Sequence, residues 1–261
     1  MHAFTYHAAR SLDDAVQRLR ADPQARPLAG GMTVIPSLKH GLLQVSQLVD
    51  LAHLPELRVL AIGAEQVHIG ALWRHQELAD LQLLAQALPG LSSLAGGIGD
   101  PQVRARGTLG GSVANNDPAA DYPAAVLALD GQLCTDRREL PAAQFFRGLF
   151  ATALAPDELL VSVRFQRARR SSYAKFRHPA SGYAMAGVFL ADLGERGLRV
   201  AVTGVCDGVL RWHEAEQAWA QGRLPAPLSH PALLHDMHAP AAYRAHLAVQ
   251  MFEQALTQIQ P

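Results

Sequence analysis

The sequence is short of cysteine, of net charge and of long apolar runs, and each shortage excludes a class of protein. Its 261 residues include two cysteines, too few for the usual four thiolates of an iron–sulfur cluster. Lysine plus arginine and aspartate plus glutamate each total 23, so no basic excess points to nucleic acid or an anionic membrane. No run of about 18 apolar residues occurs, so we expect no membrane span. The first residues lack a basic stretch leading into an apolar one, so we expect no secretory signal and a cytoplasmic protein.

Several sequence motifs are also missing. Neither His-x-x-x-His nor Cys-x-x-Cys occurs, so we expect no metal site. The dinucleotide pattern G-x-G-x-x-G and the phosphate-loop pattern G-x-x-x-x-G-K-[ST] are absent too. What is present is a globular composition, 49% hydrophobic and 18% charged, on a chain long enough for two domains.

Two glycine pairs set in small-residue segments are the most informative feature that is present. They lie in residues 28–36, LAGGMTVIP, and in residues 108–121, TLGGSVANNDPAAD. Glycine lets the backbone approach a ligand closely, and consecutive N–H groups in such a loop form a nest that suits a phosphate. One glycine pair is most often an ordinary turn. Two such loops in one chain favour a site for the two phosphates of a dinucleotide.

Hydrophobic periodicity and turn residues predict an α+β chain. Helices are expected from residue 11 onward and over 35–42, 75–78, 81–91, 121–129, 214–221 and 241–259. Strands are expected over 47–51, 58–63, 67–71, 132–135, 158–165, 183–192 and 198–205. This pattern predicts a small α/β unit at about 1–57 and a larger sheet-and-helix unit at about 58–168. An arginine-rich linker, 167–172, then leads to an antiparallel sheet with a helix bundle over 169–261.

The two glycine motifs resemble those of the FAD-binding, or medium, subunit of the molybdenum hydroxylases, the relatives of xanthine dehydrogenase and carbon monoxide dehydrogenase. Residues 173–176, YAKF, and 181–184, SGYA, match the start of that family's C-terminal domain. The resemblance covers essentially the whole chain, and the second glycine motif is its most specific part. It implies a two-subdomain FAD-binding fold, FAD as cofactor, and no catalytic or metal-ligating residues in this chain.

The resemblance also implies which residues bind the cofactor. The two glycine motifs would enclose the pyrophosphate, Asp121 would hold a ribitol or ribose hydroxyl, Lys175 would lie near the flavin, and Tyr183 would approach the isoalloxazine face. Read from the residues alone, Asp121 could instead cap a helix, Asn115 and Asp117 could order a loop, Lys175 could be a surface lysine, and Tyr183 could belong to the core. The implied cofactor-binding set is Leu28, Ala29, Gly30, Gly31, Met32, Thr33, Val34, Ile35, Ile98, Thr108, Leu109, Gly110, Gly111, Ser112, Asn115, Asp117, Asp121, Leu160, Lys175 and Tyr183.

Two positions depart from the family pattern. Many members have histidine at the position of Met32, so no imidazole role carries over to this chain. Some relatives have aspartate at the position of Gly182, beside Tyr183.

Three functions remain open at this point. In the first, the chain passes electrons through FAD from a small 2Fe-2S subunit to NAD⁺ or another acceptor, while a large molybdenum-cofactor subunit oxidises substrate, in a heterotrimer or its dimer. In the second, it is a self-contained FAD-dependent oxidoreductase of the same fold. In the third, it is a scaffold subunit that has lost FAD. The intact glycine pairs, Asp121 and Lys175 favour the first.

Overall fold

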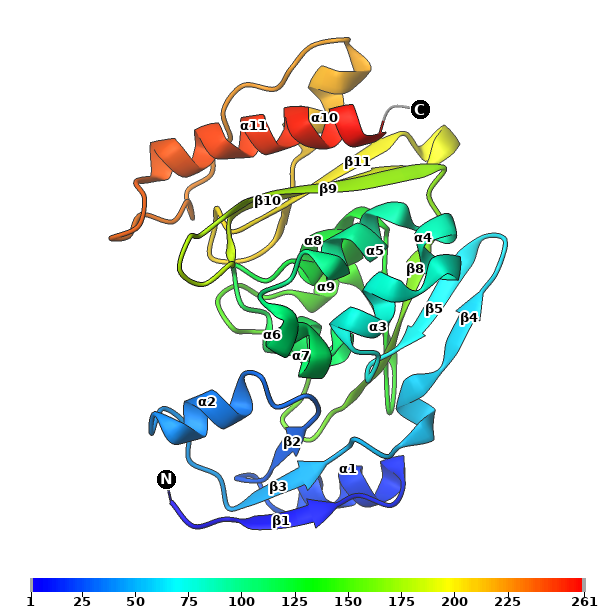
Figure 1. Ribbon diagram of the computed structural model, residues 1–261, viewed down its shortest axis with the longest axis vertical. Coiled ribbons are helices and arrows are strands. Elements are labelled where there is room, and N and C mark those ends of the chain that lie inside the picture. The colour runs from blue at the N-terminus through cyan, green and yellow to red at the C-terminus, as the bar shows by residue number, and fades with distance from the viewer. Residues whose placement is uncertain (1, 260–261) are drawn as a thin grey trace.

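The N-terminal unit is a three-stranded parallel sheet. One helix packs against the sheet, and a second helix follows one of its edge strands in the chain. A computed structural model describes residues 2–259 (Figure 1). The strands β1 (Thr5–Ala8), β2 (Arg26–Leu28) and β3 (Gln47–Asp50) pair in the order β1-β3-β2. Helix α1 (Leu12–Ala21) begins at Ser11, whose Oγ accepts a hydrogen bond from the N–H of Asp14 at 3.1 Å. Helix α2 (Val34–Lys39) ends just before Gly41, which has a positive φ of 72°.

The middle unit is an antiparallel sheet covered by short helices. Its order is β4-β5-β8-β6-β7, with β4 (Leu60–Ile62), β5 (Gln66–Gly70), β6 (Gln132–Thr135), β7 (Glu139–Pro141) and β8 (Leu160–Gln166). The helices are α3 (His75–Asp80), α4 (Gln82–Ala87), α5 (Pro89–Gly96), α6 (Pro101–Arg106), α7 (Leu109–Asn115), α8 (Tyr122–Ala128) and α9 (Ala142–Phe145). A short 3-10 helix, Pro55–Arg58, joins this unit to the first.

The C-terminal part is an antiparallel sheet between two layers of helices. The sheet runs β12-β11-β10-β9, with β9 (Arg170–Arg177), β10 (Ala184–Asp192), β11 (Leu198–Thr203) and β12 (Leu210–Arg211). Helix α11 (Ala241–Ile259) covers one face with α10 (His213–Ala220), and α5 and α8 of the middle unit contact the other face (Figure 1). The α+β fold class predicted from the sequence is confirmed.

Two local predictions were wrong. The apolar run 81–91 is not one helix, because the chain breaks at Leu88 and α5 restarts at Pro89, the position a helix tolerates best for proline. The segment 167–172 is a linker only up to Arg169. Ser171 and Ser172 belong to β9 and are buried.

Candidate functional site

A cleft of about 610 Å³ opens where the N-terminal unit meets the middle unit. The loop between β2 and α2 lies below α6 and α7 in Figure 1, and residues of all these segments line the cleft. Residues 181–183, at the end of the β9–β10 hairpin, line it from the C-terminal part. Clefts of this size, partly apolar and formed between units, are typical small-molecule sites.

At this cleft the first glycine motif packs against the residues immediately before the second motif. A β-carbon at Gly30 would overlap the carbonyl oxygen of Arg106 and lie 2.9 Å from the Cα of Gly107. Only glycine allows the first loop to pack this closely against the residues that precede the second motif. Residues from both motifs therefore form one continuous wall.

The first glycine loop presents free backbone donors to the cleft. Residues 29–33 lie outside helices and strands, and within residues 2–259 no acceptor pairs with their N–H groups. All five residues line the cleft. Gly31 has a φ of +77°, which lets the loop turn there. This loop has the properties of the expected phosphate nest.

The second glycine motif is not a nest, which corrects the sequence-based expectation. It forms the start of helix α7, and Thr108 caps that helix by accepting a bond from the N–H of Gly111 at 3.1 Å. The N–H groups of Leu109 and Gly110 donate to the carbonyls of Trp73 at 2.9 Å and Ala71 at 2.8 Å. The backbone donors of Leu109, Gly110 and Gly111 are thus already used. This motif contributes side chains and a close backbone surface to the wall.

Asp121 lies at one end of the cleft in a buried polar cluster. Its carboxylate accepts hydrogen bonds from the hydroxyl of Tyr173 and from Nζ of Lys175, the latter at 3.0 Å. The side chains of Asp121 and Lys175 are 5% and 4% exposed. Burial raises the pKa of Asp121, while Lys175 and Tyr173 act to lower it. Asp121 makes no cap bond to α8, so the capping alternative is wrong, and so is the surface reading of Lys175.

Short polar residues order the segment between α7 and Asp121. Oδ1 of Asp117 accepts a bond from the N–H of Ala119 at 2.8 Å, and both Asn115 and Asp117 line the cleft.

Burial, followed by the charges of Asp117 and Asp121, raises the pKa of Tyr183, so its hydroxyl is protonated at neutral pH. Tyr183 is 47% exposed and lines the cleft, so it is not a core residue.

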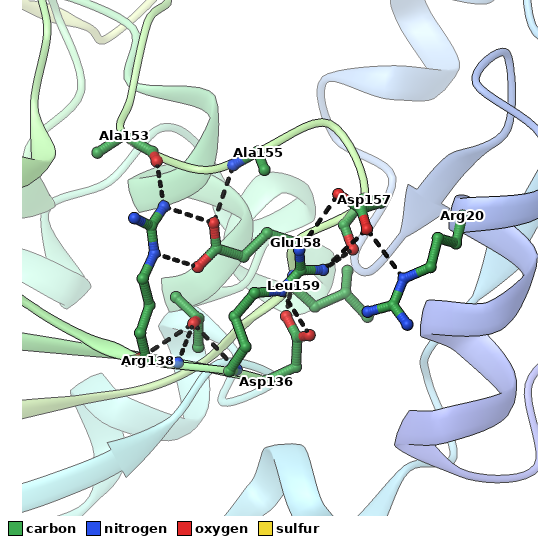
Figure 2. A network of polar contacts seen from close by, with 10 residues as sticks. Arg20, Asp136, Arg138, Ala153, Ala155, Asp157, Glu158 and Leu159 are labelled. Atoms are coloured by element: carbon green, nitrogen blue, oxygen red, sulfur yellow. Dashed lines mark hydrogen bonds and ion pairs between the residues drawn. The ribbon is translucent and has the colours of Figure 1, made fainter.

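Sequence reasoning missed an ion-pair network that borders the cleft through Glu158 (Figure 2). Arg138 binds Glu158 through two hydrogen bonds of 2.8 and 2.7 Å, and Glu158 also accepts from the N–H of Ala155 at 2.9 Å. Arg138 holds the pKa of Glu158 down at about 2, so this carboxylate stays ionised. Glu158 and Ala155 both line the cleft. No local sequence pattern marks this pair, because Arg138 and Glu158 meet only in the folded chain.

The same network joins the N-terminal unit to the middle unit. Arg20 on α1 donates to Asp157 at 3.1 Å (Figure 2), and Arg137 also contacts Asp157, at 3.0 Å. These pairs are partly exposed, so each contributes little by itself. Together they connect the two units that enclose the cleft.

His75 is a second residue that the sequence did not single out. It is 4% exposed, and burial lowers its pKa to about 4, so it is neutral at physiological pH. The backbone N–H of His75 donates to the carbonyl of Gly107 at 3.0 Å. A β-carbon at Gly107 would lie 2.5 Å from Nε2 of the His75 ring. His75 thus packs against Gly107, the residue between the first glycine motif and the second at their nearest approach.

Comparison with known proteins matches this arrangement to a family. Residues 2–165 match the model described as the FAD binding domain in molybdopterin dehydrogenase. The chain belongs to the FAD-binding medium subunits of the molybdenum hydroxylases. It is therefore an FAD-binding oxidoreductase subunit.

Individual members resemble the chain over nearly its full length. The carbon monoxide dehydrogenase medium chain of Hydrogenophaga pseudoflava is 32% identical over 97% of this chain and 96% of its own. The nicotine 6-hydroxylase medium subunit of Paenarthrobacter nicotinovorans is 29% identical over 98% of this chain and 97% of its own. A solved structure of carbon monoxide dehydrogenase from Hydrogenophaga pseudoflava superposes with a TM-score of 0.87 at 31% identity, covering 99% of this chain and 97% of that one.

The wall of the cleft includes most of the residues that the resemblance to this medium-subunit family singled out. Four of them do not line it. Leu28 and Ile35 pack against a small hydrophobic cluster, Leu109 belongs to the main core, and Lys175 reaches Asp121 instead. The sixteen that do are Ala29, Gly30, Gly31, Met32, Thr33, Val34, Ile98, Thr108, Gly110, Gly111, Ser112, Asn115, Asp117, Asp121, Leu160 and Tyr183.

Between residues 2 and 259, no three His, Cys, Asp or Glu side chains gather in a way that could hold a metal ion. No helix within the same residues has the length and apolarity to cross a bilayer.

Proposed function

We propose that this chain is the electron-transfer subunit of a molybdenum-containing hydroxylase or dehydrogenase. Its FAD would receive electrons from the iron–sulfur clusters of a small partner chain and pass them to NAD⁺ or another acceptor. A large partner chain would hold the molybdenum cofactor and oxidise the substrate. The observation that carries this proposal is that one cleft is lined both by a loop with five free N–H groups and by the second glycine motif.

The residues of the cleft fit the parts of FAD. The free N–H groups of residues 29–33 would bind the diphosphate, helped by hydroxyls of Thr33, Thr108 and Ser112. Asp121 would accept a bond from a ribitol or ribose hydroxyl, because a carboxylate would be repelled by phosphate. When bound, FAD supplies the reversible two-electron chemistry, and the protein supplies orientation and electrostatics.

Other cleft residues would contact the rings of the cofactor. Tyr183 and Ile98 would pack against the isoalloxazine, and Leu160 would meet the cofactor through backbone and packing. Lys175 does not reach into the cleft, so its effect on FAD would pass through Asp121.

The proposed partners follow from the medium-subunit family and from what this chain lacks. Two cysteines are too few to supply the usual four ligands of an iron–sulfur cluster, so the clusters would be held by another chain. The assembly would be a heterotrimer or its dimer, located in the cytoplasm. Relatives of this chain are named medium chain or medium subunit, which supports a place in such an assembly.

Purification from the native host tests the proposal. We expect a large chain and a small cysteine-rich chain to co-purify, and substrate to reduce the flavin only in their presence. Heat should release FAD and not FMN, because the cleft accommodates a diphosphate. A monomer that is fully active alone would overturn the electron-transfer role while leaving FAD binding intact.

A further inference from the structure

Phe150 is a half-exposed aromatic residue in the wall of the cleft, and the proposed function gives it no role. It is 58% exposed and lines the cleft together with Tyr183, which is 47% exposed. A large apolar side chain left open in a ligand cleft is a surface on which a ligand can pack. The proposed function places FAD in this cleft.

The backbone holds Phe150 in a conformation that bulky residues rarely adopt. Its φ is +50°, in the left-handed region. Such a conformation persists only where neighbouring groups impose it. Here Nδ2 of Asn116 donates to the carbonyl of Gly148 at 2.8 Å and to that of Ala151 at 2.7 Å. These two bonds bracket Leu149 and Phe150.

Asn116 connects this loop to the second glycine motif. It is fully buried, has a φ of +46°, and ends helix α7 by donating its N–H to the carbonyl of Ser112. The helix that carries Ser112 and the loop that carries Phe150 therefore share one attachment. Ala184, the residue after Tyr183, donates its N–H to the carbonyl of Ala119 at 3.4 Å, three residues beyond Asn116, so this attachment lies at the Tyr183 end of the cleft.

We propose that Phe150 packs against the flavin ring of bound FAD at the Tyr183 end of the cleft and shields the ring from small solutes. Asn116 is the positioning residue that holds Phe150 there. The inference rests on the proposed function, which places the flavin ring beside Tyr183. Leu149 supplies a natural comparison, because it is 60% exposed in the same loop but does not line the cleft.

Iodide quenching of flavin fluorescence in the full-length, FAD-loaded chain tests this inference. We expect Phe150→Ala at least to double the quenching constant, because removal of the ring opens a path to the flavin. Phe150→Tyr should keep the wild-type value, and so should Leu149→Ala. Loss of ring packing should also raise the dissociation constant of FAD by about two- to tenfold in Phe150→Ala.

A second variant tests Asn116 without removing the aromatic ring. Asn116→Gly keeps a residue that tolerates positive φ but deletes both bonds to the loop. We expect its quenching constant to rise as in Phe150→Ala, with unchanged far-ultraviolet circular dichroism. A folded Asn116→Gly protein with wild-type quenching would overturn the positioning role.

Tyr183→Ala separates failure of this inference from failure of the proposed function. If Tyr183→Ala increases quenching and Phe150→Ala does not, Phe150 does not shield the flavin, but the flavin lies where proposed. If neither variant changes quenching, the placement of the flavin beside Tyr183 is wrong, and with it the inference. If Phe150→Ala weakens competition by ADP with no change in quenching, Phe150 packs on the adenine instead, which also overturns the inference.

Discussion

Asp121 and Lys175 depend on each other because both side chains are buried. Their separation of 3.0 Å and near-complete burial leave little solvent to stabilise either charge alone. Tyr173 supports the same carboxylate, and a β-carbon at Gly187 would overlap the Tyr173 hydroxyl. The cluster thus requires a glycine on the neighbouring strand β10.

The first prediction removes the cation from this cluster. Lys175→Met should lower the free energy of unfolding by about 3–5 kcal/mol, because Asp121 would be a buried charge that keeps the hydrogen bond from Tyr173 but has lost its paired cation. Loss of Lys175 also raises the pKa of Asp121 further, so the variant should be least stable at high pH and recover as pH falls. Urea unfolding at pH 5 and pH 8 measures both effects.

Lys39 provides the control for this prediction, because it is an exposed lysine in the last turn of α2. Lys39→Met should leave stability nearly unchanged. The double variant Asp121→Asn, Lys175→Met should regain part of the loss. Equal stability of Lys175→Met and wild type at pH 8 would contradict an ionised pair.

The second prediction concerns the acid limit of stability. The pKa of Glu158 is lowered from 4.5 to about 2, so its stabilising effect is complete above about pH 4.5 and is lost as pH falls towards 2. Glu158→Gln should therefore cost about 2 kcal/mol at pH 7, allowing for the exposure of Arg138, and little at pH 2. Denaturant unfolding across this range measures the difference. A cost that is independent of pH would show that the charge of Glu158 is unimportant.

At the scale of elements, the two glycines of helix α7 have different neighbours. A β-carbon at Gly110 would overlap the Cβ of Ala71 and lie 2.8 Å from its Cα. At Gly111, among residues 2–259, the only close atom would be Oγ1 of Thr108, at 2.8 Å. Both glycines line the cleft, but only Gly110 is packed closely against the backbone of Ala71.

The third prediction separates these two roles. Gly110→Ala should destabilise the protein by about 1–3 kcal/mol through overpacking, despite a helix-propensity gain of about 1 kcal/mol. Gly111→Ala should change stability much less, whereas Gly111→Leu should abolish FAD binding by filling the cleft. Thermal unfolding without FAD and FAD titration measure the two effects. A fully yellow Gly111→Leu protein would place the cofactor elsewhere.

Elements with a continuous apolar face were predictable from the sequence, and those stabilised by distant polar partners were not. Helix α1 shows its buried face directly as Ala15, Val16 and Leu19. The start of β9 reads as a linker because Ser171 and Ser172 are polar. Their hydroxyls are satisfied in the fold, where Ser171 accepts from the N–H of Gly90 at 3.1 Å and Ser172 donates to Ala255 at 2.7 Å.

The same limit applies to the site. Both glycine pairs look alike in the sequence, but only the first keeps its N–H groups free. The second loses its donors to Ala71 and Trp73, residues that no local pattern connects with Gly110. The ion pair of Arg138 with Glu158 was missed for the same reason, since the two residues meet only through tertiary structure.

At the scale of the whole molecule, the C-terminal part makes hydrogen bonds to residues 118–120 of the middle unit, just before Asp121. Oγ1 of Thr203 contacts the carbonyls of Pro118 at 2.9 Å and Ala120 at 2.7 Å, and the N–H of Gly204 donates to Pro118 at 2.8 Å. These bonds fix the residues immediately before Asp121. The family match ends at residue 165, yet Thr203, the last residue of β11, bonds to Ala120, which lines the cleft.

The fourth prediction tests this dependence. Thr203→Val keeps the shape of the side chain but leaves buried carbonyls with fewer donors, which should cost about 1–3 kcal/mol of stability. FAD affinity should fall as well, because Asp121 is less firmly placed. Thr257→Val, which removes an exposed hydroxyl bonded to Gln254, is the control for both calorimetry and FAD titration. Unchanged FAD affinity in Thr203→Val would show that the sheet does not position Asp121.

The contacts of Thr203 have a consequence for biosynthesis. A ribosome releases the first glycine loop early, but the segment before Asp121 gains its hydrogen-bond donors only after residue 203 has emerged. A nascent chain stalled before that point would lack part of the cleft even with residues 1–168 outside the exit tunnel. We therefore expect the cofactor to be captured after nearly the whole polypeptide has been made, so that flavin shortage would leave complete but empty chains in the cell.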